Sequence, residues 1–89
     1  MTIHLPTYRH RSLEQVLAIR SLYAQGKLQQ LLTPRELLCV ELYYIRQCSM
    51  PQISRQLYLH PSTISRTLAR AEGRIRTWEE DERDKKSLL

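Results

Sequence analysis

The stretch SMPQISRQLYLHPSTISRTLARAEGRIR, from Ser49 to Arg76, decides the fold that we expect for this chain. Ser49 and Gln52 form an S-x-x-Q capping box, which predicts the start of a short helix. A turn is expected over 58–60, and Pro61 is a favourable first residue for a second helix. Two helices joined by a tight turn, the second rich in Ser, Thr and Arg, are typical of a helix-turn-helix motif, which binds DNA.

The two sides of this second helix differ in chemistry. Apolar residues recur at steps of three and four and predict an inner stripe: Ile64, Leu68, Ala71, Ile75 and Trp78. Polar and cationic residues fall away from that stripe: Ser62, Ser65, Arg66 and Arg70. The exposed side of the helix is therefore expected to be polar and cationic.

Upstream of the motif, Thr33-Pro34-Arg35-Glu36 supplies an N-cap, a Pro at the first helical position and a Glu at the third. The helix that follows has a wide apolar stripe, so we expect it to be packed on more than one side: Leu37, Leu38, Val40, Leu42, Tyr44 and Ile45. An earlier helix is predicted to begin at Ser12 and to end near Gly26, with a short continuation over 28–32. Its apolar side carries Leu13, Val16, Leu17, Ile19, Leu22 and Tyr23.

We therefore predict an all-α fold, a small bundle of four to five helices with a long basic C-terminal helix. At 89 residues the chain has room for one domain, which we place at 12–78. Residues 1–11 are predicted to be a flexible arm, and 79–89 either extend the last helix or fray.

Positive charge is concentrated on the proposed motif. The chain has a formal net charge of +5, which suits a polyanionic partner. Residues 47–78 contain five Arg and one acidic residue, whereas 79–89 contain five acidic and three basic residues. For Arg74 and Arg76, the simplest interpretation is a solvated helix face.

Other classes of site are disfavoured. Cys39 and Cys48 are nine residues apart without a CxxC pattern, so we expect no zinc site and place Cys39 in the core. The three His residues lie far apart without a nucleophile, metal motif or Gly-rich loop, so we expect no enzyme and no cofactor. Since no signal peptide and no apolar run of ~20 residues is present, we expect a cytoplasmic protein that does not span a membrane.

The run LLTPRELLCVELYYIRQCSMPQISRQLYLHPSTISRTLARAEGRIR, Leu31 to Arg76, resembles region 4 of bacterial sigma factors, the domain that recognises the upstream promoter element. The L-T-P-R-E opening, E-L-Y-Y and the I-S-R…L-H-P-S-T-I-S-R pair carry the resemblance. It implies transcription regulation, with double-stranded DNA as partner and core RNA polymerase or a partner sigma-like subunit as further candidates. The candidate DNA-binding residues are Arg35, Met50, Pro51, Arg55, His60, Pro61, Ser62, Thr63, Ser65, Arg66 and Arg70.

The resemblance also implies a role for most of these residues. Arg35 and Arg70 correspond to contacts with the DNA backbone, and the helix N-terminus at 50–51 approaches a phosphate. His60 would cap the last helix. Base-reading positions, or contacts with adjacent phosphates, fall on Ser62, Thr63, Ser65 and Arg66.

Three departures from the family pattern limit what is implied. Pro61, Ser62 and Ser65 stand where the family often has Arg and Glu, so fewer bidentate base contacts are expected and the usual promoter sequence is not implied. Tyr58 stands where Gly is common, so we expect an altered turn. Only about thirty residues precede the match, too few for the other sigma regions. We therefore expect a stand-alone regulator or an accessory subunit.

Other functions remain open. A protein–protein adaptor that resembles the helix-turn-helix proteins of the signal recognition particle would share the L-T…E-L-Y-Y segment and an acidic helical tail. The DNA-binding arm of a transposase, or a plain bundle with a solvated basic face, would also fit. The helix at 12–23 is the candidate homodimer interface, unless it only covers the core of its own domain.

Overall fold

The computed structural model describes residues 12–87, and these residues form helices and connecting turns without a strand. The elements are α1 (Leu13–Ala24), α2 (Leu28–Leu31), α3 (Pro34–Val40), the π-helical η1 (Glu41–Ile45), α4 (Met50–Leu57) and α5 (Pro61–Ser87). The predicted all-α class is thus confirmed. Helix α5 runs on through the charged segment, so residues 79–87 extend the last helix. The predicted arm at 1–11 lies outside the described residues.

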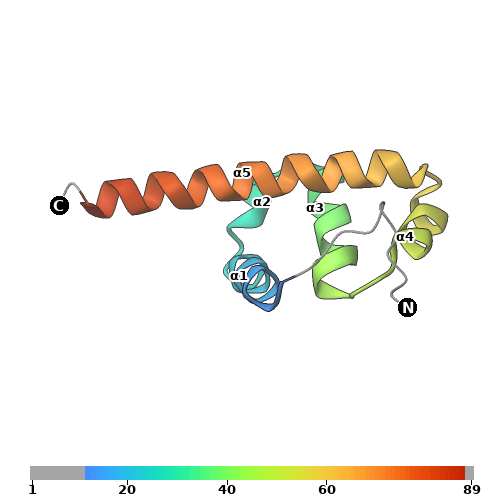
Figure 1. Ribbon diagram of the computed structural model, residues 1–89, viewed down its shortest axis with the longest axis horizontal. Helices are drawn as coiled ribbons and strands as arrows, with labels where there is room; N and C mark the ends of the chain where they lie inside the picture. Colours follow the sequence, from blue (N-terminus) through green and yellow to red (C-terminus); the bar gives the residue numbers. More distant parts are fainter. Residues whose placement is uncertain (1–11, 88–89) are drawn as a thin grey trace, which may run out of the picture.

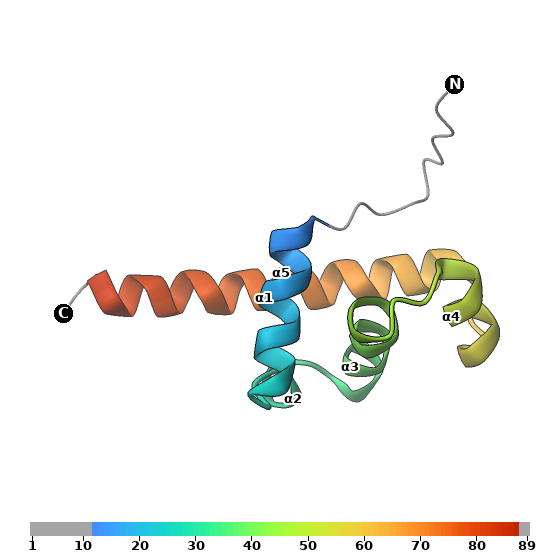
Figure 2. The same cartoon turned by 90° about the horizontal axis from the view of Figure 1, so that it is seen from below.

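Helix α5 is the long axis of the molecule, and α1, α3 and α4 lie on one side of it (Figure 1). Helix α4 lies near the N-terminal end of α5, while α1 crosses α5 near its middle (Figures 1 and 2). The C-terminal turns of α5 project beyond the other helices. One side of the N-terminal half of α5 is therefore left uncovered by the bundle.

Local hydrogen bonds explain why the helices begin where they do. Before α3, Thr33 Oγ1 accepts from the Glu36 amide at 3.2 Å, and Glu36 Oε1 accepts from the Thr33 amide at 3.0 Å. Ser49 and Gln52 form the same reciprocal pair before α4. These two capping boxes confirm the predicted helix starts. At α1, Ser12 Oγ accepts from the backbone amide three residues on, which confirms Ser12 as the N-cap.

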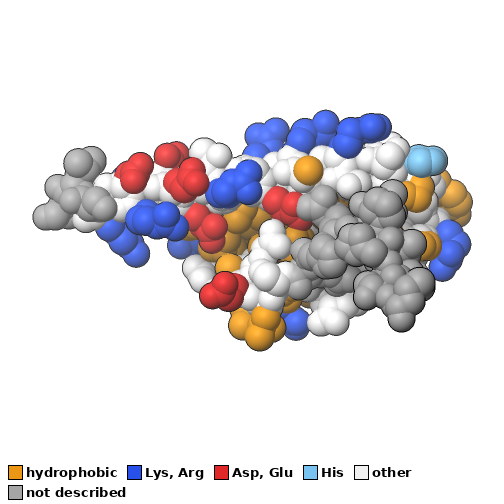
Figure 3. Space-filling view, viewed as in Figure 1, with side chains coloured by type: hydrophobic (Ala, Val, Ile, Leu, Met, Phe, Trp, Pro, Cys, Tyr) orange, Lys and Arg blue, Asp and Glu red, His pale blue; other side chains and the backbone are white. Residues whose placement is uncertain are grey.

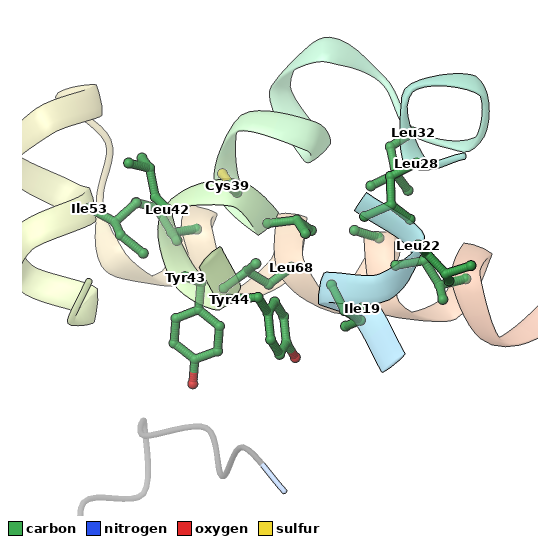
Figure 4. Packing of buried hydrophobic residues seen from close by; sticks show 14 of the residues in the cluster. Ile19, Leu22, Leu28, Leu32, Cys39, Leu42, Tyr43, Tyr44, Ile53 and Leu68 are labelled. Carbon is green, nitrogen blue, oxygen red and sulfur yellow. The ribbon is translucent and has the colours of Figure 1, made fainter. Parts of the chain in front are cut away.

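The core lies between α5 and the helices on its one side (Figure 4). The predicted inner stripe of α5 is confirmed: Ile64, Leu68 and Ala71 are fully buried, Ile75 is 4% exposed and Trp78 packs at the edge. Cys39 is also fully buried, as expected of a small core residue.

Three leucines predicted to lie on apolar faces are instead exposed. Leu38 of α3 is 42% exposed, and Leu13 and Leu17 of α1 are 71% and 57% exposed. Helix α1 is packed on a narrower side than the sequence suggests, because only Ile19 and Leu22 of this helix are buried. The segment formed by α3 and η1 contacts α1, α2, α4 and α5, so its predicted packing on more than one side is confirmed. Leu13 and Leu17 thus remain on the outer surface of the helix that we identified as a candidate homodimer interface.

The chain after α3 widens into a π-turn, which the sequence pattern does not predict. The Arg46 amide donates to the Glu41 carbonyl five residues back, at 3.0 Å. Three consecutive side chains are buried in this segment: Leu42, Tyr43 and Tyr44. The rings of Tyr43 and Tyr44 meet edge to face with centroids 5.0 Å apart (Figure 4), and the Tyr44 hydroxyl donates to the carboxylate of Glu72 on α5. This segment thereby fixes α5 against α3.

The described helices contain no span that is long and apolar enough to cross a membrane.

Candidate nucleic-acid interface

The turn between α4 and α5 is held in one geometry by hydrogen bonds across it. The Leu59 amide donates to the Ser54 carbonyl at 3.2 Å, and the Ser54 hydroxyl donates to the Leu59 carbonyl. Tyr58 has φ 57° and ψ 41°, the left-handed conformation, and its side chain is 93% exposed. The turn therefore requires a positive φ at Tyr58, a conformation that favours Gly, and Tyr58 bears the strain.

Replacing Tyr58 with Gly tests this strain. The left-handed conformation costs an ordinary residue about 1–2 kcal/mol, while Gly carries an entropic cost of about 0.5–1 kcal/mol elsewhere. Since the exposed ring contributes little packing, we expect Tyr58→Gly to raise the free energy of unfolding by up to about 1 kcal/mol. Urea denaturation of both proteins measures it, with Tyr58→Ala as the control that removes the ring but keeps a Cβ. A loss of stability in the Gly variant alone would show that the backbone at Tyr58 is not strained.

His60 caps the first turn of α5, as expected. Its Nδ1 lies 3.1 Å from the Ser62 amide and 2.9 Å from the Ser62 hydroxyl, and its carbonyl accepts from the Thr63 amide at 2.9 Å. A backbone amide can only donate, so Nδ1 is the acceptor and the ring proton of the neutral His lies on Nε2. The exposed His60 ring therefore presents a donor at the start of α5.

The uncovered side of α5 carries polar and cationic residues. Ser62, Arg66 and Arg70 are exposed and follow one another at intervals of four residues, so each lies about one turn beyond the last. Thr63 and Ser65 are half-buried at the flanks. Lys and Arg side chains follow this side of the N-terminal half of α5, whereas acidic side chains gather over its C-terminal part (Figure 3). One end of α5 is thus suited to an anionic surface.

The remaining predicted residues lie on α3 and α4 rather than on α5. Arg35 and Pro51 are exposed in the first turns of α3 and α4, and Arg55 is exposed in the last turn of α4. The Met50 side chain is buried at 8% exposure and packs in the core, so only the backbone at this position is left to meet a phosphate.

An ion pair that the sequence analysis missed joins α3 to α5. Arg74 Nε lies 3.1 Å from Glu36 Oε1 and 3.2 Å from Oε2, although the two residues are 38 apart in the sequence. Glu36 is 4% exposed, whereas about half of the Arg74 side chain reaches solvent. Arg74 is therefore a bridge between helices and not merely part of a solvated face. The capping box locates Glu36, but no local spacing identifies its distant partner.

The surroundings of Glu36 favour its charged form. Burial by itself would raise the pKa of this carboxyl, but the hydrogen bond from the Thr33 amide and the adjacent Arg74 guanidinium outweigh it, so the pKa lies below its ordinary value. The stabilisation is present above the pKa of the unfolded chain, about 4.3, and is lost as the pH falls through the lower folded-state pKa.

This lowered pKa predicts a pH-dependent difference between the wild type and Glu36→Gln. At pH 7 the wild type should melt at the higher temperature, and the gap should narrow as the pH falls from about 4.3 downwards because Glu36 then becomes neutral as well. Thermal melts from pH 7 to pH 3 measure the gap. A gap that stays constant over this range would show that the charge of Glu36 does not stabilise the fold.

The part of the chain that the structure describes shows no group of His, Cys, Asp or Glu side chains that could hold a metal ion. Burial raises the pKa of the Cys39 thiol, which disfavours its reactive thiolate form.

Most of the predicted site lies on the first turns of α5 or directly before them. His60 immediately precedes the helix, and the helix carries Pro61, Ser62, Thr63, Ser65, Arg66 and Arg70. No protein-family model, no curated protein and no solved structure matches this chain.

Proposed function

We propose that this protein is a sequence-specific DNA-binding transcription regulator, or an accessory sigma-like protein, that acts in the cytoplasm. In this proposal the N-terminal half of α5 lies in the major groove of duplex DNA. The observation that carries it is the row of exposed Ser62, Arg66 and Arg70 on α5. None of the other described helices covers one side of the N-terminal half of α5 (Figure 1).

The dimensions of the helix support this docking. The major groove is about 12 Å wide and admits one α-helix. A helix with its side chains is about 10–12 Å across, so it fits this width, and the residues from Pro61 to Arg70 extend about 14 Å along its axis. Ser62 and Arg66 would then face base edges, and Arg70 would meet the DNA backbone. Arg offers bidentate contacts to guanine, while Ser accepts or donates to several bases.

The neighbouring helix supports the same orientation. Helix α4 is anchored by Ile53, which is fully buried, and its turn is fixed by Ser54 and Leu59. The exposed Arg55 and Pro51 would then lie beside the groove, where a phosphate backbone passes. The exposed Leu13 and Leu17 of α1 are suited to pairing with a second copy, which would let the protein read two half-sites.

A selection of binding sites from random duplexes, at physiological salt, tests this function. We expect an enriched motif and binding that weakens steeply with salt. A motif with two half-sites about one helical turn apart would indicate a dimer, and a single short motif a monomer. The regulator proposal would be overturned if no motif were enriched and the residual binding were weak and insensitive to salt.

Co-purification distinguishes the two forms of the proposal from its rival. Recovery of core RNA polymerase with the full chain would identify an accessory subunit, and its absence beside an enriched motif would identify an independent regulator. Recovery of the signal recognition particle without an enriched motif would favour the adaptor.

A further inference from the structure

Arg74 continues the row of arginines on α5. It follows Arg70 by four residues, as Arg70 follows Arg66, so the three side chains lie about one turn apart. Each step also turns the row by about 40° around the helix, and Arg74 faces Glu36 of α3. Unlike the other two, Arg74 is tied to a buried carboxylate of α3. The carboxylate of Glu36 is itself fixed, because its Oε1 also accepts from the Thr33 amide.

The ion pair leaves most of the Arg74 guanidinium available. Both of its short contacts with Glu36 use Nε, and its side chain is 53% exposed. A guanidinium carries five N–H donors in a planar fork, so the four donors on the two Nη atoms remain for another acceptor. Holding Nε against a fixed carboxylate restricts the plane of this fork before any ligand arrives, which lowers the ordering cost of binding.

The position of Arg74 along α5 suits a phosphate. It lies about 20 Å from Pro61 along the axis at 1.5 Å per residue, one turn beyond Arg70. If the first turns of α5 enter the groove, a side chain this far along the helix would lie towards the sugar-phosphate strand. Arg35, directly before Glu36 at the start of α3, is exposed as well.

We propose that Arg74 contacts a DNA phosphate and that Glu36 is the residue that positions it. This inference rests on the proposed docking of α5 in the major groove. It extends the protein surface that contacts DNA from α5 to the start of α3. A purely structural ion pair is the alternative, in which Arg74 stabilises the packing of α3 on α5 and contacts no DNA.

Salt titrations of duplex binding test the phosphate contact. Each neutralised phosphate contributes about −0.9 to the slope of log K against log salt. We therefore expect Arg74→Gln to make the slope shallower by about 0.9 and to weaken all duplexes alike. Since this variant leaves the buried carboxylate unpaired, the comparison is repeated between Glu36→Gln and the double variant Glu36→Gln/Arg74→Gln, which differ only in Arg74. Circular dichroism confirms that each variant is folded at the temperature of measurement.

Glu36→Gln alone tests the positioning role. It keeps the charge of Arg74, so the slope should stay at the wild-type value while affinity falls about two- to tenfold through the lost ordering of the side chain. Arg20→Gln is the matched control for Arg74→Gln. Arg20 is exposed on α1, so this substitution also removes one positive charge, and we expect it to leave the salt slope unchanged.

The outcomes separate this inference from the proposed function. If the wild type binds duplexes with a steep salt dependence but Arg74→Gln keeps the full slope, Arg74 contacts no phosphate and the inference is wrong while the proposed function stands. If Glu36→Gln binds as tightly as the wild type, Glu36 does not position Arg74. If the wild type itself shows no salt-dependent binding, the proposed function fails and the inference fails with it.

Discussion

Leu68→Ala is expected to lower the free energy of unfolding by about 2–5 kcal/mol. Leu68 is fully buried on the inner side of α5, within the cluster that joins this helix to α3, α4 and η1 (Figure 4). Removing its side chain loses apolar burial and leaves a cavity that the packed neighbours fill only in part. A domain of this size has a total stability of about 5–10 kcal/mol, so the variant should unfold at a much lower urea concentration.

Leu38→Ala is the matched control for this substitution. Leu38 is 42% exposed on α3, so the same chemical change should alter the free energy of unfolding by no more than about 0.5 kcal/mol. Equal losses in the two variants would show that α5 is not packed as described.

Replacing the arginines on the uncovered side of α5 is expected to have the largest effect on DNA binding. Arg66→Ala should cost about 1–3 kcal/mol on the preferred duplex and relax the sequence preference, because Arg66 lies where a side chain would reach base edges. Arg70→Ala should weaken all duplexes alike and make the salt slope shallower by about 1, because Arg70 lies one turn further on, towards the phosphates. Competition titrations with preferred and scrambled duplexes measure both effects.

Arg20→Ala is the control for charge in this experiment, because it removes one exposed positive charge from α1. Both α5 variants should remain folded, since Arg66 and Arg70 are exposed and lie away from the core. If Arg20→Ala weakened binding as much as Arg66→Ala and Arg70→Ala, net charge and not the surface of α5 would explain the affinity.

The helices of this protein are predictable because their signals are local. The capping boxes at Thr33 and Ser49 join residues three positions apart, and the inner stripe of α5 follows from the helical period. Gly26, with φ +75°, follows the C-cap of α1 and stops the helix, as the conformational freedom of Gly suggests. Such features depend on a few neighbouring residues and need no knowledge of the tertiary structure.

The features that the sequence did not predict depend on contacts between distant segments. The π-turn at 41–45 buries both Tyr43 and Tyr44, two neighbouring residues that no local periodicity places together in the core. The partner of Glu36 lies 38 residues away, so Arg74 could not be told from a solvated arginine. Leu38 is apolar and on a helical face, yet it is 42% exposed, because none of the helices within residues 12–87 covers it.

The central claim, that the N-terminal half of α5 binds duplex DNA, is tested most directly by nuclear magnetic resonance. The isotope-labelled full chain would be titrated with a duplex enriched by the selection, or with a random-sequence duplex if no motif is enriched. We predict that the largest changes in backbone amide shifts fall on residues 60–70, with smaller changes near Arg35 and Arg55, and that salt reverses them. Shifts confined to α1 or to the acidic C-terminal turns of α5, or no shifts at all, would contradict the claim.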